Sequence, residues 1–438
     1  MMACASGEPM NPCDGVGPPS PSKRGGRMSA RWGWLMAVLP AVLVSVAVQA
    51  VLAGRLGQMG TDYEAFYAPV AHRIAAGQGV TDNTGAVATR YPPGFPLILA
   101  AAEAAAMPFG VPLSTAARWL NVLGYGLMCA GAYGLARRIW SVRAAILVAV
   151  LCATYPIAVF MNTYPSSEIW FTACLFAALA LWHGGLSPER GATWRMLGAG
   201  VSVGLAMLVR PIGVGVGVVL AALIWCALAS APPTRRLWLG GVLLTGNALV
   251  VAPWQCYVLA TSGKAILLST AAVPGIRDGL TFGVRLKGYR RPLALPEDVR
   301  RLMNSIADEG SSLTTVGAIA RTVGSLALQH PVAATKLLAI KAARSWYGTD
   351  SQSNETPIIV IQLLYLPLCA WALWRARRSE SGVRVLGAAL GWLAVYFWCA
   401  TVAVLPVVRY SATSVVLLFA LWPVLLRGAS TEPVMRPS

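Results

Sequence analysis

The stretch that decides the fold is "WGWLMAVLPAVLVSVAVQAVLAG" (32–54), an apolar run without a charged residue. As a helix, a run of this length crosses a hydrocarbon core about 30 Å thick. Its apolar residues are continuous, whereas a barrel strand would alternate apolar and polar residues. Because lipid offers the backbone no hydrogen-bond partners, the sequence predicts a transmembrane helix here.

Similar runs recur along the whole chain. Of its 438 residues, 56% are hydrophobic and only 12% are charged, whereas a soluble domain is about 25% charged. We therefore predict an all-α, polytopic bundle of about 10–12 transmembrane spans. The runs that can be placed lie at 33–54, 115–136, 143–161, 165–184, 195–209, 211–229, 237–259, 357–375, 385–404 and 408–426.

The net charge of +18 would suggest a nucleic-acid partner in a soluble protein. In a membrane protein, cytoplasmic loops rich in arginine and an anionic lipid substrate explain it better, so no nucleic acid is expected. With the N-terminus in the cytoplasm, the short basic loops all fall on the inner side; they carry Arg137, Arg138, Arg143, Arg190, Arg195, Arg235, Arg236, Arg375, Arg377, Arg378, Arg384 and Arg427. We predict a multi-pass protein of the plasma (inner) membrane.

The chain divides into five parts. Residues 1–31 are rich in Pro, Gly and Ser, which predicts a disordered cytoplasmic tail. A signal peptide is the alternative, but its apolar core would be shorter than the run that follows. We expect a transmembrane catalytic core at 32–259 that includes a first outer loop at 55–113, then an extracytoplasmic helical loop, C-terminal transmembrane helices and a tail, at 260–356, 357–428 and 429–438.

Both outer parts contain predicted helices. In the first, "GFPLILAAAEAAAMP" (94–108) is short and bounded by prolines, so a juxtamembrane or re-entrant helix is expected, although a full crossing stays open. In the second, "PEDVRRLMNSIADEG" (296–310) and "HPVAATKLLAIKAARSWYG" (330–348) predict surface helices. The second of these carries Lys336, Lys341 and Arg344 along an apolar face, and we expect it to lie on the bilayer.

Acids are scarce, which makes "TDYEAFYAPVAHRIAAGQG" (61–79) informative. It places Asp62 and Glu64 just after the first span, with His72 and Arg73 close behind. The simplest interpretation is that the acids cap a helix that begins here. On a helix, side chains two residues apart diverge, so one of the two acids is expected to face a given cleft.

Other charged residues lie at the same outer face. They come from "ATRYPPGFP" (88–96), "NTYPSSE" (162–168), "MLVRPIG" (207–213) and "LPVVRYSA" (405–412), and they are Arg90, Tyr91, Glu168, Arg210, Arg409 and Tyr410. Snorkelling or capping can explain any one of these arginines. Together they indicate a site for an anionic lipid head group, since arginine suits phosphate oxygens and a carboxylate can deprotonate an attacking hydroxyl.

The order of these motifs resembles a known family. In its order of motifs the chain is similar to the GT-C membrane glycosyltransferases. The motifs are the first outer loop with "DYEAFY…A…GQG", then "RYPPGFPLILA", "ARWLNVLGYGLMCAGAYGLARRIW" (117–140), "YPSSE", "LVRP" and "HPVAATKLLAIKAARSW". The likeness is to the branch containing protein O-mannosyltransferases and the lipid A aminoarabinose transferase. It is scattered over residues 55–410 and is densest in 61–140.

The resemblance implies a function and roles. Such enzymes transfer a sugar, with inversion, from a polyprenyl-phosphate or polyprenyl-diphosphate carrier to an acceptor hydroxyl at the extracytoplasmic face. By resemblance, Asp62 is the general base, Glu64 and Glu168 stand where further acids are found, and Arg90 meets the carrier phosphate. Many family members have lysine in place of this arginine. With Tyr91, Arg210, Arg409, Tyr410, His72 and Arg73 as candidate substrate-binding residues, these make up the expected site.

Two alternatives stay open. A flippase or transporter of a lipid-linked sugar would also need outward cations, but it predicts a site near the bilayer midplane and an inverted repeat, which we do not find. A ligase or polymerase of lipid-linked glycans would share the enzyme class. The histidines at 72, 183 and 330 lack metal-ligand spacing. No metal site is predicted, although relatives leave a divalent metal as an option; the partners expected are membrane lipid, the donor and an unknown acceptor.

Overall fold

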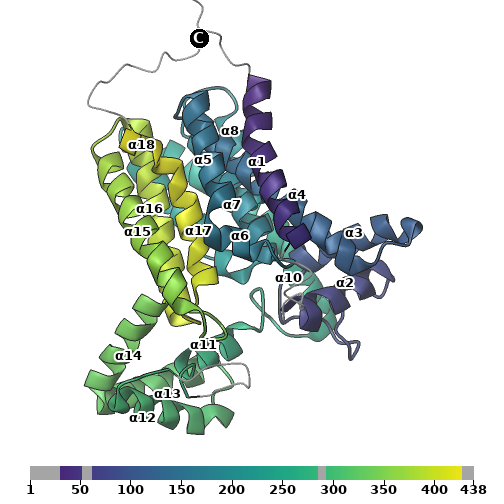
Figure 1. Cartoon of the computed structure of the whole chain (residues 1–438), viewed down its shortest axis with the longest axis vertical. Helices are drawn as coiled ribbons and strands as arrows, with labels where there is room; N and C mark the ends of the chain where they lie inside the picture. The colour runs from purple at the N-terminus through teal and green to yellow at the C-terminus, as the bar shows by residue number, and fades with distance from the viewer. Residues whose placement is uncertain (1–29, 52–61, 285–292, 427–438) are drawn as a thin grey trace, which may run out of the picture.

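The computed structural model describes residues 30–51, 62–284 and 293–426 (Figure 1). Most of the predicted N-terminal tail and the whole C-terminal tail, with Arg427, lie outside the described residues. Within the described ranges the regular secondary structure is helical, and the one exception is an isolated β-bridge between Thr81 and Val87. The prediction of an all-α fold is confirmed.

The predicted spans all correspond to helices or to pairs of short helices. They are α1 (Ala30–Val51), α4 (Leu113–Arg137), α5 (Val142–Thr154) with α6 (Pro156–Met161), α7 (Ser167–Gly185), α8 (Ala192–Val209), α9 (Val216–Ala227), α10 (Pro233–Ser262), α15 (Glu355–Arg377), α16 (Ser381–Ala403), and α17 (Val408–Leu418) with α18 (Pro423–Leu426). Among the described helices, 6 are long and apolar enough to cross a membrane, and shorter apolar helices accompany them. The chain is a multi-pass membrane protein.

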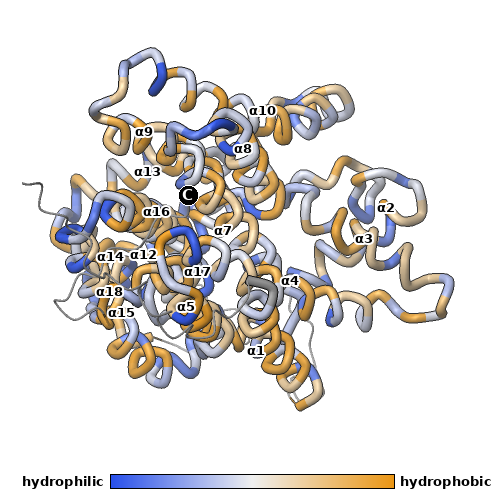
Figure 2. Tube along the Cα trace, turned by 90° about the horizontal axis from the view of Figure 1, so that it is seen from above, coloured by the Kyte–Doolittle hydropathy of each residue, from blue (hydrophilic) through white to orange (hydrophobic). Residues whose placement is uncertain are grey.

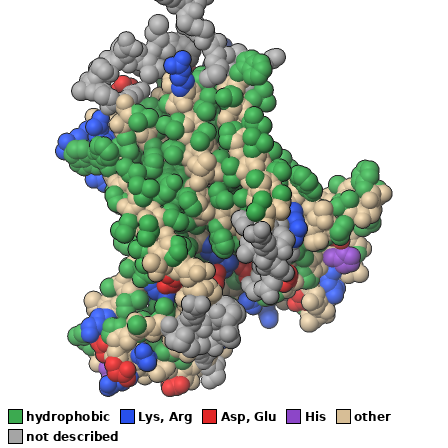
Figure 3. All heavy atoms as spheres, viewed as in Figure 1, with side chains coloured by type: hydrophobic (Ala, Val, Ile, Leu, Met, Phe, Trp, Pro, Cys, Tyr) green, Lys and Arg blue, Asp and Glu red, His purple; other side chains and the backbone are tan. Residues whose placement is uncertain are grey.

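These helices form a bundle along the long axis of the molecule, with hydrophobic side chains over much of its visible face (Figures 1 and 3). The start of α1 and the end of α18 lie at the same end, drawn at the top of Figure 1. Acidic side chains appear mainly at the opposite, lower end in Figure 3. Lys and Arg side chains are visible at both ends in this view, so the two ends differ in their acidic side chains.

Two helices from the first outer loop project sideways from the bundle. They are α2 (Ala68–Ala75), which follows the helical turn η1 (Tyr63–Tyr67), and α3 (Gly94–Ala106), which continues into the turn η2 (Met107–Phe109). Both lie to one side of the bundle when seen from above (Figure 2). Because α3 runs across the bundle axis in Figure 1, a juxtamembrane position suits it better than a crossing.

A close backbone approach fixes α3 against the bundle. A Cβ atom at Gly94 would lie 2.5 Å from the carbonyl oxygen of Leu208, near the end of α8. Real Cβ atoms are not found at such distances, so the contact depends on glycine. It brings the segment before α3, which carries Arg90 and Tyr91, next to the turn that carries Arg210.

The second outer region lies at the lower end of the bundle (Figure 1). It contains α11 (Ala272–Leu280), α12 (Glu297–Asp308), the turn η4 (Glu309–Ser311), α13 (Val316–Gln329) and α14 (Pro331–Arg344). The predicted helix at 296–310 is confirmed as α12, whose apolar face belongs to a small core separate from that of the bundle. This core is formed by Leu280, Phe282, Val299, Leu302, Met303, Ile306, Leu313, Ile319, Ala333 and Leu337.

The helix predicted at 330–348 exists as α14, but the prediction of a surface helix lying on the bilayer is wrong for its C-terminal half. Lys341 is only 4% exposed and Arg344 only 3%. Lys341 Nζ lies 3.4 Å from the carbonyl oxygen of Ala403, and Arg344 pairs with Glu355 at 2.6 Å. This half of α14 is buried because its cations find partners on the bundle that are distant in sequence.

Candidate active site

Asp62 lies immediately before the wide helical turn η1 and faces inward from the first outer loop. Its side chain makes no capping hydrogen bond to this turn. Instead, Oδ1 accepts a hydrogen bond from the Tyr91 hydroxyl at 3.2 Å, and Oδ2 pairs with Arg409 Nη1 at 3.2 Å. Helix capping, the simplest interpretation of this acid, is therefore not what holds it.

Arg409 connects both outer regions to the bundle. It is the second residue of α17, which begins after Val407 in an extended conformation. Besides its contact with Asp62, its Nε lies 3.4 Å from an oxygen of Asp350, and its Nη2 donates to the Tyr410 hydroxyl at 3.1 Å. One guanidinium thus lies between a carboxylate of the first outer loop and a carboxylate of the second outer region.

A second ion pair lies deeper. Arg210 is the extended residue between α8 and the turn η3 (Pro211–Gly213), and the following proline favours that conformation. Its Nη1 lies 2.5 Å from Glu168 Oε1 and donates to Ser167 Oγ at 3.0 Å. Glu168 is 5% exposed, and its Oε2 accepts from Ser166 Oγ at 2.9 Å. A buried pair of this kind is stable only while both charges are present.

The Tyr410 ring joins the two ion pairs. Its centroid lies 5.1 Å from the Arg210 guanidinium carbon and 5.0 Å from that of Arg409, within the range of cation–π attraction. Asp62, Arg409, Tyr410, Arg210 and Glu168 therefore form one continuous group, which we call the outer cluster. The structure brings together five of the ten residues predicted from the sequence, and Tyr91 joins them through its bond to Asp62.

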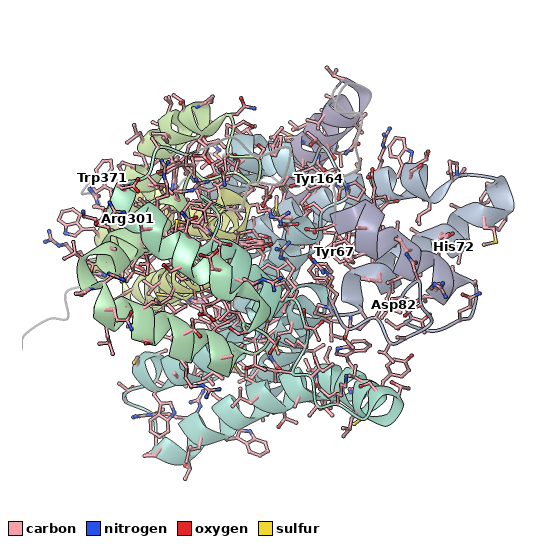
Figure 4. The ribbon with its side chains drawn as sticks, turned by 90° about the horizontal axis from the view of Figure 1, so that it is seen from below. Tyr67, His72, Asp82, Tyr164, Arg301 and Trp371 are labelled. Carbon is pink, nitrogen blue, oxygen red and sulfur yellow. The ribbon has the colours of Figure 1, made fainter. Side chains whose placement is uncertain are left out.

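Buried tyrosines surround the outer cluster. Burial raises the pKa of Tyr91 to about 12, and the charge of Asp62 adds to the effect. Its phenol therefore keeps its proton at neutral pH and can donate to Asp62. Burial also raises the pKa of Tyr67, which is near Arg210 and Ser167. Figure 4 shows Tyr67 and Tyr164 near the middle of the molecule when seen from below.

Four predicted residues lie outside the outer cluster. Glu64 is exposed on η1, and the Arg90 guanidinium lies 4.1 Å from the centre of the Phe66 ring. His72 pairs with Glu103 of α3 at 2.7 Å, and Arg73 donates to Gln78 at 3.3 Å. Figure 4 shows His72 on the far side of α2 from Tyr164. The last two side chains thus connect parts of the first outer loop to one another.

Sequence reasoning missed Asp350, Tyr67, Tyr164, Ser166 and Ser167. The serines and Tyr164 stand within the quoted "NTYPSSE" (162–168), so the signal was the polar segment around Glu168. Asp350 follows α14 by a few residues, just before the chain returns to the bundle in α15. Like Glu168, Asp350 is an acid at a point where the chain re-enters the bundle. A search of the sequence for acids at such points would have found it.

The described side chains around the outer cluster do not form a metal site. Among the described residues, no group of three or more His, Cys, Asp or Glu side chains is placed to hold one. Asp62 and Asp350, the two carboxylates that could share an ion, both face Arg409, so a guanidinium already lies where a cation would bind. No step below uses a metal.

The geometry can be compared with known proteins. Residues 91–257 match the model of a family described as dolichyl-phosphate-mannose-protein mannosyltransferase. A search of curated protein sequences found no match.

Two structures of the oligosaccharyltransferase AglB from Archaeoglobus fulgidus are similar in fold. One, in complex with an inhibitory peptide and a dolichol-phosphate, gives a TM-score of 0.53 at 14% identity, covering 90% of this chain and 50% of AglB. The apo form gives 0.53 at 15% identity with the same coverage.

A further similar structure is ArnT from Cupriavidus metallidurans bound to undecaprenyl phosphate, with a TM-score of 0.44 and 16% identity over 90% of this chain and 78% of ArnT. The present chain spans about half the length of the archaeal enzyme. At these identities the structural likeness concerns the fold. The resemblance expected from the motifs is confirmed: the chain has the fold of the GT-C glycosyltransferases, and its central part resembles the mannosyltransferase family.

Proposed function

We propose that this chain is an inverting glycosyltransferase that moves a sugar from a polyprenyl-phosphate donor to an acceptor hydroxyl at the extracytoplasmic face. The observation that carries the proposal is the contact of Asp62 with Arg409, and of Arg409 with the Tyr410 ring beside Arg210. A carboxylate that can accept a proton thus lies beside two cations that can hold a phosphate. The archaeal relative, solved with a dolichol-phosphate, supports a lipid phosphate as the donor class.

The proposed reaction is a single displacement. The acceptor oxygen attacks the anomeric carbon of the sugar, the bond from that carbon to the donor phosphate oxygen breaks, and the acceptor proton passes to Asp62. A carboxylate has about four lone-pair positions, so Asp62 can accept from the acceptor while it contacts Tyr91 and Arg409. Attack from the face opposite the phosphate inverts the configuration.

The cations have separate roles in this proposal. Arg409 and Arg210 stabilise the negative charge that develops on the departing phosphate. Glu168 is engaged at both oxygens and buried, so we assign it to positioning Arg210 and not to proton transfer. Because the bundle end with the termini carries the loop arginines, we place that end in the cytoplasm and the outer cluster outside the inner membrane.

Substitution of Asp62 tests the proposal. We expect Asp62→Asn to lower sugar transfer from labelled polyprenyl-phosphate sugars by about 10²-fold or more, because the variant cannot take the proton. Binding of polyprenyl phosphate should not weaken, since the isosteric amide preserves the pocket and competes less for Arg409 than the carboxylate does. Asp308→Asn, an exposed acid on α12, is the matched control and should keep full activity.

The outcomes separate the alternatives. Equal transfer by wild type and Asp62→Asn would remove Asp62 from the mechanism. If membranes with the wild-type protein transfer no sugar but move the intact lipid-linked sugar across the bilayer, the chain is a flippase. Transfer onto a second lipid-linked glycan, and not onto another class of acceptor, would identify a ligase or polymerase.

A further inference from the structure

A cavity separate from the outer cluster lies within the first outer loop. Its volume is about 340 Å³, within the range of about 300–1,000 Å³ that is usual for small-molecule sites. Its lining includes the aromatic residues Phe66, Tyr67 and Tyr91, together with the polar residues Asn83, Thr84 and Arg90. The aromatic rings can cover apolar ring faces, while the polar side chains can bond to hydroxyl groups. We call this cavity the loop pocket.

The polar wall of the loop pocket is held by its own hydrogen bonds. The chain reverses between Thr81 and Val87, which form a β-bridge, with Gly85 in the left-handed region at φ +83. Asp82 Oδ1 accepts from the backbone nitrogen of Thr84 at 2.8 Å and from its hydroxyl at 2.6 Å. These bonds hold the pKa of Asp82 below its usual value. The wall is therefore formed before any ligand binds.

The second outer region closes the loop pocket. The backbone nitrogen of Thr270, which lies between α10 and α11, donates to the carbonyl oxygen of Thr89 at 2.8 Å. Ser269 donates from its hydroxyl to the carbonyl oxygen of Arg90. Hydrogen bonds from a distant segment of the chain thus hold the carbonyl groups of Thr89 and Arg90. These bonds fix the position of the Arg90 backbone, from which its side chain extends.

Arg90 supplies the charge of the loop pocket. Its guanidinium lies over the Phe66 ring and, among the described residues, makes no hydrogen bond or ion pair. One face of the guanidinium is thus covered by an aromatic ring, while its edge donors stay available. Arg73, and not Arg90, is the cation that acts on Asp82. Arg90 is exposed, and the ligand group that suits its planar fork of donors best is an anion with two oxygens, such as a carboxylate or a phosphate.

The loop pocket and the outer cluster share a wall. Tyr91 lines the pocket and also donates from its hydroxyl to Asp62, and Tyr67 lines the pocket and lies near Arg210. A ligand in the loop pocket therefore lies one side chain away from the proposed base. On the other side of this wall, Arg210 and Arg409 already provide cations for the donor phosphate.

We propose that the loop pocket binds the head group of the acceptor, which carries hydroxyl groups and an anionic group, a carboxylate or a phosphate, that pairs with Arg90. The role as acceptor site rests on the proposed function, whereas binding of the anionic group does not. The family resemblance instead assigns Arg90 to the phosphate of the lipid carrier, and the experiment therefore measures binding of both the acceptor group and the donor phosphate.

The test measures binding to the full-length protein in nanodiscs. Glucuronate and glucose serve as probes in saturation-transfer NMR titrations, and undecaprenyl phosphate is titrated separately by tryptophan fluorescence. We expect Arg90→Gln to weaken glucuronate binding at least about tenfold with little effect on glucose, and Arg90→Lys to restore part of the loss. Arg300→Gln, an exposed arginine on α12, is the control and should bind as wild type does.

The lipid titration decides between the two sources. We expect Arg90→Gln to bind undecaprenyl phosphate as the wild type does and Arg409→Gln to bind it more weakly. The proposal is overturned if the wild type does not bind glucuronate, if Arg90→Gln binds it equally well, or if Arg90→Gln loses the lipid phosphate as Arg409→Gln does. None of these readouts needs turnover, so they stand apart from the activity of Asp62→Asn.

Discussion

Arg210 carries a full positive charge although only 14% of its side chain is exposed. The charge is compensated by Glu168, which is fixed by the two serines beside it. Glu168 also lies in the first turn of α7, where the helix dipole favours a negative charge. The pair therefore depends on both partners, and losing either one leaves a buried charge alone.

We expect Glu168→Ala to lower the free energy of unfolding by about 3–5 kcal/mol, because Arg210 is left unpaired. The double variant Glu168→Gln with Arg210→Gln should cost less than the single one, since no unpaired charge remains. Thermal unfolding in detergent measures both. Arg300→Ala, which removes an exposed side chain on α12, is the control and should change the stability by no more than about 0.5 kcal/mol. A double variant less stable than Glu168→Ala would contradict this account.

Lys341 gives a prediction about pH. Burial lowers its pKa from 10.5 to about 8. Between these two values the unfolded chain binds the proton more tightly than the folded protein does, so stability rises as the pH increases from about 8 to 10.5. Lys341→Met should abolish this rise. Wild-type and variant melting temperatures, measured from pH 7.5 to 10, should therefore converge; parallel curves would show that burial of this charge is not the cause.

Which residues meet in the outer cluster could be predicted only in part. Asp62, Glu168, Arg210 and Arg409 were identified because a charge at a membrane boundary needs a partner. His72 and Arg73 follow Asp62 closely in the sequence, yet α2 directs them to Glu103 and to the loop at 78–83. Sequence proximity could not reveal this, because the direction of each side chain depends on how α2 packs against α3.

At the scale of helices, α8 and α10 are held together by glycines. A Cβ atom at Gly246 of α10 would clash with the carbonyl oxygen of Leu197, and one at Gly200 of α8 with that of Leu243. Small residues at such crossings let helix backbones approach closely in membranes. Since α8 ends at Arg210, the position of this arginine depends on the crossing.

Two alanine substitutions in α10 separate packing from helix propensity. Gly246→Ala should lower the free energy of unfolding by about 1–3 kcal/mol, because the new methyl group overlaps α8. Gly241→Ala, where nothing lies within 4 Å of the new atom, should be neutral or stabilise by up to about 1 kcal/mol. Thermal unfolding of both in the same detergent checks this, and equal effects would contradict the close approach.

The sequence predicted the helices well because the length of an apolar run is a direct physical requirement of the bilayer. It predicted α14 as a helix but not its burial. Lys341 and Arg344 looked like surface residues, since their partners at Ala403 and Glu355 belong to other helices. From sequence alone, a cation is expected at the surface. Its burial can be predicted only when its polar or charged partner is known, and the partner is set by tertiary packing.

At the scale of the whole molecule, the basic loops and the outer regions lie at opposite ends of the bundle. The alternation of loop arginines along the sequence was enough to predict this arrangement. It was not enough to predict how the two outer regions meet, because Asp350, Thr270 and Arg409 join them through single contacts with no sequence pattern of their own.

Single cysteines can test the orientation. In a variant without native cysteines, Asn83→Cys in the first outer loop should react with a membrane-impermeant maleimide added to intact cells. Arg190→Cys, in the loop between α7 and α8, should react only after the membrane is permeabilised. Both positions are exposed, so accessibility within the protein does not limit the reaction. The reverse pattern would invert the proposed topology.

Arg409 between Asp62 and Asp350 has a consequence for the order of events. A phosphate that reaches this guanidinium must compete with both carboxylates, and its arrival frees an oxygen of Asp62 at the same moment. Under the proposed function, Asp62 thus becomes fully available as a base only once the donor phosphate is bound. In the proposed reaction, donor binding therefore precedes deprotonation of the acceptor.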